Sequence, residues 1–306
     1  MTMSAALTSE PEELMHVLQQ VVDGITSGSI YGALALALVL VYRSTGLINF
    51  AQGQMAAVSA YVAYSLTRSG FPVVAAIVVA ALVSAAMGAA LERALVRRFE
   101  RADHLVTIVV TVAILICGNG LISLFWGADL KPFPAIFPSR NLSLGDLRFT
   151  VSDVGTVVVL LGVIAVVHLL FQRTRFGLAM RAVAENRESS AQSGLPVGRL
   201  LMAGWGLAAL IGSVAGCLVA PTISLQPGMM DGILVYALAA AVLGGLDSPL
   251  GAIVAAWLIG ITQNLAGAYV DFIGSDLQIV VPLILMVVVL LVRPQGLFGR
   301  KEVQRV

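Results

Sequence analysis

The sequence predicts an all-α protein: a polytopic transmembrane helix bundle of about eight or nine spans, with an amphipathic helix on its cytoplasmic side. The 306 residues are 58% hydrophobic and only 11% charged, with a mean hydropathy of +0.95, outside the range of soluble globular proteins. The apolar residues form continuous blocks of roughly 15–25 residues, the length of helix that crosses about 30 Å of hydrocarbon. A transmembrane β-barrel would instead alternate apolar and polar residues. One charged segment, residues 171–200, separates two of these blocks.

Nine apolar blocks follow one another along the chain. They cover residues 17–42, 46–66, 71–92, 105–126, 152–171, 200–220, 232–246, 250–270 and 277–292. Two of them are unusual, because 232–246 is short and 46–54 (GLINFAQGQ) is polar for a helix that faces lipid. We interpret both as candidates for broken or re-entrant segments, which are tolerated only inside protein or beside a cavity. Nine crossings are expected if every block spans the membrane, and eight if one block is re-entrant.

The basic residues predict which side of the membrane each connection faces. One set comprises Arg43, the group from Arg93 to Arg101, the five arginines of the charged segment, and Arg293, Arg300, Lys301 and Arg305. The smaller set comprises Arg68, Lys131, Arg140 and Arg148. The positive-inside rule places the larger set in the cytoplasm. The C-terminus is then inside, and the acidic N-terminus is outside with nine crossings or inside with eight.

Small residues recur every fourth position in several blocks. The stripes are Gly24, Gly28 and Gly32, then Ala80, Ser84 and Gly88, and finally Gly212 with Gly216. Such stripes let helices approach closely where lipid offers no hydrophobic drive to associate. They indicate a tightly packed bundle and do not define a function.

We expect one domain, residues 1–306, with two notable connections. The predicted extracytoplasmic loop 127–151 contains Pro132, Pro134 and Pro138, which argue against a helix there. The predicted cytoplasmic loop spans residues 172–199. Because the N-terminus lacks a basic region and carries acidic residues, we expect no secretory signal, and the first apolar block remains a true span.

The sequence contains no pattern typical of catalysis, metal binding or nucleotide hydrolysis. Cys117 and Cys217 lie within apolar blocks, and the three histidines lack further ligands at metal-binding spacing. No GxSxG nucleophile motif and no phosphate-binding loop is present. We therefore expect no catalytic residue, no metal, no cofactor and no nucleic-acid partner.

The polar residues inside the apolar blocks are mainly amides. Ion-coupled carriers usually place ionisable side chains deep in their spans, whereas Asp23 and Asp247 lie near span ends. Amides can bind a polar solute without titrating, so the energy for transport is expected to come from a partner. The candidate substrate-pathway residues are Asn49, Gln52, Gln54, Gln263 and Asn264. Asn49 and Gln52 would equally satisfy broken backbone, and Gln263 and Asn264 would serve as interhelical hydrogen-bonding groups.

The charged segment predicts one amphipathic helix over residues 175–194. Thr174 is a suitable N-cap, Gly194 suits a left-handed helix end, and Pro196 prevents continuation. The apolar face consists of Phe176, Met180, Val183 and Ala184. Such a helix can lie on the lipid surface or in a groove of another protein. The acidic residues Glu185 and Glu188 weigh against the lipid surface.

Four blocks of sequence carry a resemblance to a known family. They are GITSGSIYGALALALVLVYRSTGLINFAQGQ at 24–54, RFGLAMRAVAENRESSAQSGLPVGR at 175–199, AAAVLGGLDSPLGAIVAAWLIG at 239–260 and RPQGLFGRKEV at 293–303. Over nearly its whole length the chain resembles the permeases of bacterial branched-chain amino acid ABC importers, the Liv-type integral-membrane subunits.

This resemblance implies a multi-pass permease subunit in the bacterial inner membrane that translocates branched-chain or other small amino acids. It also implies the partners: two cytoplasmic ATPase subunits, a second permease subunit (the same chain or a different one) and an extracytoplasmic solute-binding protein. Residues 175–194 resemble the coupling helix that docks on the ATPase. Arg181, Ala184, Glu185 and Gly194 match the family pattern RA-x-AE-x(8)-G.

Three departures from the family pattern concern the solute. The family's NFAHGE is NFAQGQ here, so Gln52 and Gln54 replace a histidine and a glutamate, and Gln263 replaces an acidic residue. Urea or a short amide is therefore as admissible a solute as leucine. The alternative of a different class is an ion-coupled secondary transporter or channel that acts alone, and an intramembrane enzyme lacks the necessary nucleophile or metal ligands.

Overall fold

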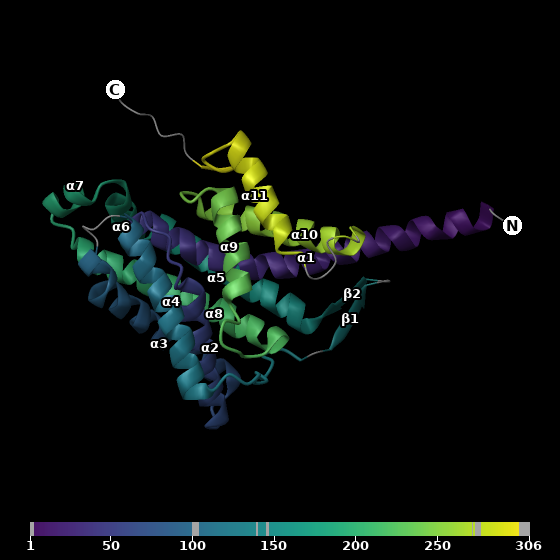
Figure 1. The fold of residues 1–306 in the computed structure, drawn as a ribbon, viewed down its shortest axis with the longest axis horizontal. Coiled ribbons are helices and arrows are strands. Elements are labelled where there is room, and N and C mark those ends of the chain that lie inside the picture. Colours follow the sequence, from purple (N-terminus) through teal and green to yellow (C-terminus); the bar gives the residue numbers. More distant parts are fainter. Residues whose placement is uncertain are drawn as a thin grey trace.

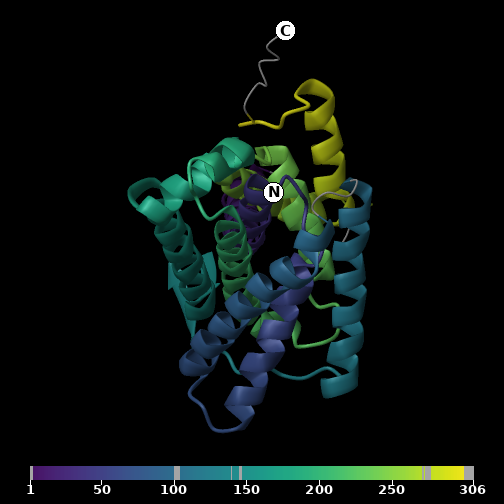
Figure 2. The same ribbon diagram turned by 90° about the vertical axis from the view of Figure 1, so that its left-hand side faces the viewer.

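The protein is a helix bundle with one small β-hairpin, which agrees with the predicted all-α class (Figure 1). The computed structural model describes residues 3–99, 104–138, 140–144, 147–270, 272 and 277–299. Helix α1 (Met3–Thr45) lies in the middle of the bundle, and Figure 2 shows the other helices around it. Among the described residues, six helices are long and apolar enough to cross a membrane.

The remaining elements follow in chain order. They are α2 (Gln52–Arg68), α3 (Val73–Ala94), the 3-10 helix η1 (Val96–Phe99), α4 (His104–Trp126), β1 (Asn141–Leu144), β2 (Leu147–Thr150), α5 (Val151–Arg173), α6 (Arg175–Glu185), α7 (Arg187–Gln192), α8 (Val197–Ile223), α9 (Asp231–Gly244), α10 (Pro249–Tyr269) and α11 (Val280–Val292).

Three of the nine predicted spans are shorter as helices than a full crossing. Helix α2 has 17 residues, α9 has 14 and α11 has 13. At about 1.5 Å per residue, α9 reaches only about 21 Å, less than the hydrocarbon thickness. Block 46–66 begins with a non-helical stretch after Thr45, so helix starts only at Gln52. The two blocks singled out as irregular in the sequence are irregular here too.

The glycine stripe of α1 packs directly against the backbone of α10. A Cβ atom on Gly28 would lie 2.7 Å from the Ala256 carbonyl oxygen and 2.8 Å from the Trp257 Cα atom of α10. Gly24 meets Gly260 and Ile261 one turn further along. Trp257 also donates a hydrogen bond from Nε1 to Ser29 Oγ at 3.0 Å. The stripe therefore holds α10 against the central helix.

The other small-residue stripes gather α2 and α3 around α8. Gly88 packs against Ala209 and the Trp205 carbonyl, and Ser84 Oγ donates to the Ala209 carbonyl oxygen at 3.0 Å. Gly216 of α8 lies against the Ala56 carbonyl of α2. Removing side-chain bulk at these positions allows backbone-to-backbone contact without water. The predicted packing role of the stripes is thus confirmed.

The loop between α4 and α5 contains an unpredicted β-hairpin. Its proline-rich part is not helical, as expected, but β1 and β2 pair antiparallel from Asn141 with Thr150 to Leu144 with Leu147. The Gln19 side chain of α1 bonds both backbone groups of Arg148, donating to its oxygen at 2.7 Å and accepting from its nitrogen at 2.9 Å. An amide side chain thus closes part of the open strand edge.

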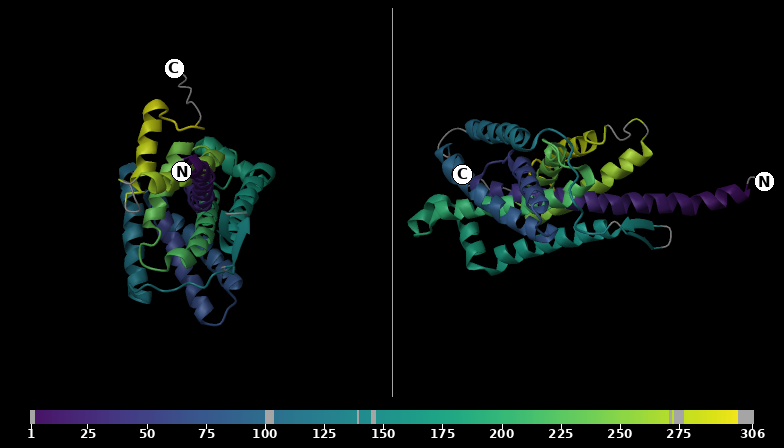
Figure 3. Two further views of the ribbon diagram at one scale, coloured as in Figure 1. Left: turned by 90° about the vertical axis from the view of Figure 1, so that its right-hand side faces the viewer. Right: turned by 90° about the horizontal axis from the view of Figure 1, so that it is seen from below.

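The predicted cytoplasmic segments meet at the end of the bundle opposite the hairpin (Figure 3, right). Arg187 of α7 donates to the Ser44 carbonyl oxygen at 2.7 Å, at the end of α1. Arg97 of η1 pairs with Glu92 and also donates to the Gly198 carbonyl oxygen at the start of α8. The charged segment is therefore bonded to α1 and to η1.

We expect Gly28→Leu to destabilise the bundle, because its side chain would meet the α10 backbone rather than a flexible neighbour. Overpacking typically costs about 1–3 kcal/mol, and rigid backbone places this case at the upper end. Gly162→Leu is the matched control, since a Cβ on Gly162 meets nothing within 4 Å. Thermal unfolding in detergent should give a markedly lower midpoint for Gly28→Leu alone. Equal midpoints for the two variants would contradict the packing described here.

Candidate functional site

The break between α1 and α2 is held by two buried amides. Asn49 Oδ1 accepts from the Ala51 backbone nitrogen at 3.0 Å, and its Nδ2 donates to Gln52 Oε1 at 3.2 Å. Gln52 Nε2 in turn donates to the Ala208 carbonyl oxygen of α8 at 2.9 Å. Both side chains are fully buried. These bonds satisfy irregular backbone and tie the start of α2 to α8.

Gln54 differs from these two amides because its polar atoms have no partner. The side chain is 2% exposed, and neither Oε1 nor Nε2 makes a hydrogen bond to any described residue. Each unpaired buried polar group lowers the stability of a protein by about 1–3 kcal/mol. Gln54 lines a cavity of about 590 Å³ between α2, α3 and α4, with otherwise apolar walls that include Val58, Met87 and Ile122. An uncompensated amide facing an apolar cavity indicates a site for a partner from outside the chain.

The first turns of helices α2 and α9 touch, where Gln52 and Gly53 are buried and Asp231 is exposed. A Cβ on Gly53 would lie 3.3 Å from Leu234 Cβ and 3.4 Å from Met230 Cβ, so glycine permits this approach. Neither helix start has a side-chain cap. The N-terminal ends of helices carry partial positive charge and free N–H groups. Paired half-helix starts of this kind form polar sites in membrane transporters.

An acidic residue at this meeting point is not among the sequence candidates. Asp231 occupies the first turn of α9, and its carboxylate interacts with the Asn119 side chain of α4. The Oδ1 atom of Asn119 is buried without a hydrogen-bond partner among the described residues. An acid just before an alanine-rich helical run is a helix-start signal that would have located Asp231. The site thus combines the carboxylate of Asp231, the amides of Gln54 and Asn119, and the N-termini of α2 and α9.

Gln263 and Asn264 lie elsewhere, on α10. Gln263 is 7% exposed and donates from Nε2 to Gln278 Oε1 at 3.3 Å, in the segment before α11, while its Oε1 has no partner in the described part of the chain. Asn264 donates to the Gly260 carbonyl oxygen of its own helix at 2.8 Å. The five candidate pathway residues therefore divide between the start of α2 and the C-terminal half of α10.

The charged segment contains two helices rather than the one predicted. Thr174 caps α6 as expected, accepting from the Gly177 nitrogen at 3.0 Å, and Gly194 has the expected positive φ of 80°. Asn186, however, has extended backbone and caps a second helix, α7, by accepting from the Ser189 nitrogen at 2.9 Å. The asparagine side chain competes with the backbone for this bond and divides the helix.

The inner face of α6 packs on the bundle and leaves other positions exposed. Met180 and Val183 are buried in a cluster with Leu200 and Leu201 of α8. Phe176, on the predicted apolar face, is half-buried, but Ala184 is exposed, contrary to that prediction. Glu185 and Gly194 are exposed as well, and Arg181 is half-buried. The segment therefore has one face packed against the bundle and a small exposed surface on its other side.

Taken together, these features define a multi-pass membrane protein with a broken-helix core and an exposed charged segment. A family model described as "Branched-chain amino acid transport system / permease component" matches residues 20–290. The chain belongs to this family, whose members are transport components and not enzymes.

Curated relatives agree with this assignment. The high-affinity branched-chain amino acid transport system permease protein LivH of Escherichia coli K12 is 30% identical over 314 residues, which cover 96% of this chain and 99% of LivH. The corresponding protein BraD of Pseudomonas aeruginosa is 28% identical over 312 residues, with the same coverage. A solved structure, PsaBC from Streptococcus pneumoniae in complex with Fab, has a TM-score of 0.47 and 16% identity over 91% of this chain and 92% of that one.

We predict that substitution by leucine lowers the stability of the protein at Gln52 but not at Gln54. Gln52→Leu removes the bonds to Ala208 and Asn49 and should cost roughly 1–3 kcal/mol of stability. Gln54→Leu removes two unpaired polar atoms from an apolar wall, so stability should stay equal or rise. Thermal unfolding midpoints in detergent measure both effects. Equal destabilisation by the two substitutions would show that Gln54 is paired in the folded protein.

Proposed function

We propose that this chain is the membrane-spanning permease subunit of an ABC importer in the bacterial inner membrane. Its solutes are branched-chain or other small amino acids, and the whole chain acts as one transmembrane domain. The observation that carries the proposal is the family match over residues 20–290. The partners are two cytoplasmic ATPases, a second permease subunit and an extracytoplasmic solute-binding protein.

In this proposal the charged segment receives the movement of the ATPase. Ala184, Glu185 and Gly194 are exposed and form the docking positions, with Arg181 beside them. The buried contacts of Met180 and Val183 with α8, and the bond from Arg187 to the end of α1, make the segment a rigid extension of the bundle. A force applied there is transmitted to α1 and α8 rather than absorbed by a loose loop.

The solute is proposed to pass the meeting point of α2 and α9. The unpaired Gln54 amide and the Asn119–Asp231 pair offer hydrogen bonds to the polar end of an amino acid. The apolar wall of the adjoining cavity suits a branched hydrocarbon side chain. Asn49 and Gln52 hold this site in place, and Gln263 and Asn264 form a second polar position along the pathway.

The unpaired Gln54 also favours a second candidate solute. An amide recognises another amide through one donor and one acceptor, so urea or a short amide would satisfy both of its free atoms. Competition between unlabelled urea and labelled leucine during uptake decides between the two solutes. If a large excess of urea leaves leucine uptake unaffected, the result supports an amino acid as the solute.

We predict that Glu185→Ala and Gly194→Pro each reduce ATP-driven solute uptake at least tenfold in proteoliposomes that contain all partner subunits. Proline fixes φ near −65°, which the positive φ of Gly194 does not allow, and Glu185→Ala removes an exposed charge from the proposed docking surface. Glu13→Ala, which removes an exposed acid at the far end of α1, should leave uptake unchanged.

Two results would contradict the proposal. One is wild-type uptake in both variants of the charged segment. The other is uptake by the purified chain alone, driven by a proton or sodium gradient without ATP, which would establish a secondary transporter instead.

A further inference from the structure

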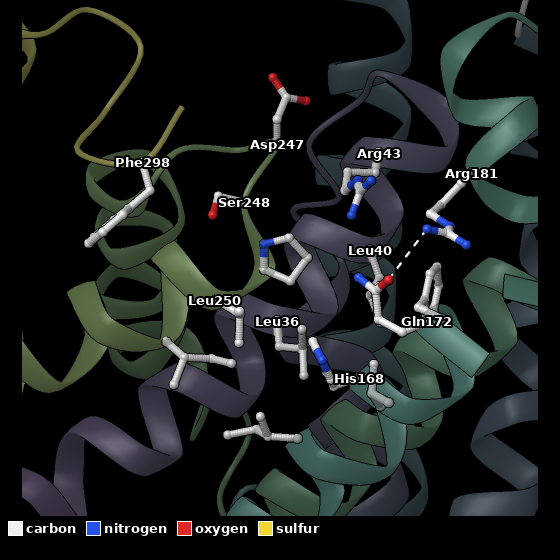
Figure 4. Close-up of a pocket in the computed structure, with 15 residues that line it drawn as sticks. Leu36, Leu40, Arg43, His168, Gln172, Arg181, Asp247, Ser248, Leu250 and Phe298 are labelled. Carbon is white, nitrogen blue, oxygen red and sulfur yellow. Dashed lines mark hydrogen bonds between the residues drawn. The ribbon is translucent and has the colours of Figure 1, made fainter. Parts of the chain in front are cut away.

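A second cavity lies at the cytoplasmic end of the bundle, away from Gln54. It has a volume of about 300 Å³ and is enclosed by the ends of α1 and α5, by α6, and by the link between α9 and α10 (Figure 4). Phe298, after α11, covers one side. The solute pathway proposed above does not use this space, and of the proposed docking positions only Arg181 lines it.

The walls of this cavity carry charges of both signs. Arg43 and Arg181 lie on one side, and Asp247 stands at the rim across from them (Figure 4). The Nε atom of Arg181 is buried and has no hydrogen-bond partner within the described ranges. Its Nη1 makes only a long bond of 3.4 Å to Gln172 Oε1. A buried guanidinium donor without an acceptor points to an anionic group that enters from outside.

The deeper part of the cavity is apolar. Leu36 and Leu40 of α1 form its floor, and Ile164 of α5 and Ile253 of α10 flank them. Leu36 and Leu40 are almost fully buried, so the floor is a fixed surface of the central helix. An occupant therefore meets branched hydrocarbon below and charges above.

We propose that this cavity binds a free α-amino acid with an apolar side chain, taken from the cytoplasm. Its carboxylate pairs with Arg181 and Arg43, its ammonium group with Asp247, and its side chain rests on Leu36 and Leu40. A guanidinium binds a carboxylate in a bidentate, charge-assisted manner. The volume lies at the small end of ligand cavities, which suits an amino acid better than the two acyl chains of a phospholipid.

The site would act as a product sensor, and this role rests on the transport function proposed above. Arg181 belongs to α6, in the segment proposed to receive the ATPase, whereas Asp247 belongs to the link between α9 and α10. An amino acid bound between them would bridge the two sides and hold α6 still. Accumulated solute in the cytoplasm would then slow further import.

The test measures equilibrium binding of radiolabelled L-leucine to the purified full-length chain in lipid nanodiscs without ethanolamine lipids. Wild type should bind leucine, whereas Arg43→Gln and Asp247→Asn should each weaken binding at least tenfold. Arg175→Gln, which removes an exposed arginine of α6 outside the cavity lining, should bind as wild type does. All variants are measured in a Gln54→Leu background, which removes a ligand of the proposed pathway site, so the remaining leucine binding reports the cavity beside Arg43 and Asp247. Thermal unfolding confirms that each variant is folded.

Two analogues define the chemistry of the ligand. Leucinamide lacks the carboxylate and 4-methylpentanoate lacks the ammonium group, so neither should displace leucine at concentrations where valine does. Absence of leucine binding, binding unchanged in both Arg43→Gln and Asp247→Asn, or equal displacement by both analogues would overturn the proposal. Displacement of leucine when phosphatidylethanolamine is added to the nanodiscs would assign the cavity to a lipid headgroup and would overturn it as well.

Regulation is measured separately, by ATP-driven uptake into proteoliposomes of the complete importer. Leucine preloaded inside should slow wild-type uptake several-fold, and Arg43→Gln should remove this inhibition while uptake into empty vesicles stays normal. Uptake that fails in every vesicle would count against the transport function, whereas normal uptake without inhibition counts against the sensor alone.

Discussion

A backbone N–H or C=O group left unpaired in hydrocarbon costs several kcal/mol, and the two interruptions of this bundle obey that constraint. After α1, the side chain of Asn49 accepts a hydrogen bond from the Ala51 nitrogen. The backbone carbonyl of Asn49 accepts a second one from the Gln52 backbone nitrogen. Before α9, Leu225 and Lys131 exchange two backbone hydrogen bonds. Because local and neighbouring groups pair these backbone atoms, α2 can begin at buried residues and α9 can begin against it. The polar core of the molecule depends on those two starts.

The packing of the other helices positions the N-termini of α2 and α9. Glycine in α1 brings α10 to backbone contact, and small residues of α3 and α8 bring α2 and α3 against α8. Gly53 then lets the first turn of α2 meet that of α9. By contrast, α4 rests on α2 and η1 and leaves an apolar cavity beside Gln54. Close packing on one side of α2 and open space on the other give its two glutamines different roles.

Much of the fold follows from hydrophobic blocks and helix-end signals. Six long apolar blocks became long helices, and Thr174 and Gly194 mark the ends they predict. The division of the charged segment at Asn186 was missed, because a lone asparagine competes with several good helix formers around it. The hairpin was missed as well, although residues 142–149 alternate around a Gly-Asp pair, a recognised hairpin signal.

The site was harder to predict, because identical residue types two positions apart behave differently. Residues i and i+2 of a helix point about 200° apart, so Gln52 reaches α8 while Gln54 faces α3 and α4. Sequence alone shows neither which neighbour each face meets nor that Asp231 lies beside Asn119. Such long-range contacts depend on tertiary packing and leave no local signal.

The central claim is that the charged segment docks a cytoplasmic ATPase, and crosslinking tests it most directly. A photocrosslinking amino acid at the exposed position Ala184 should give an adduct with the ATPase in membranes that contain the whole importer. The same residue at Ser69, exposed in the turn after α2, should give none. No adduct from position 184, or equal yields from both positions, would contradict the account.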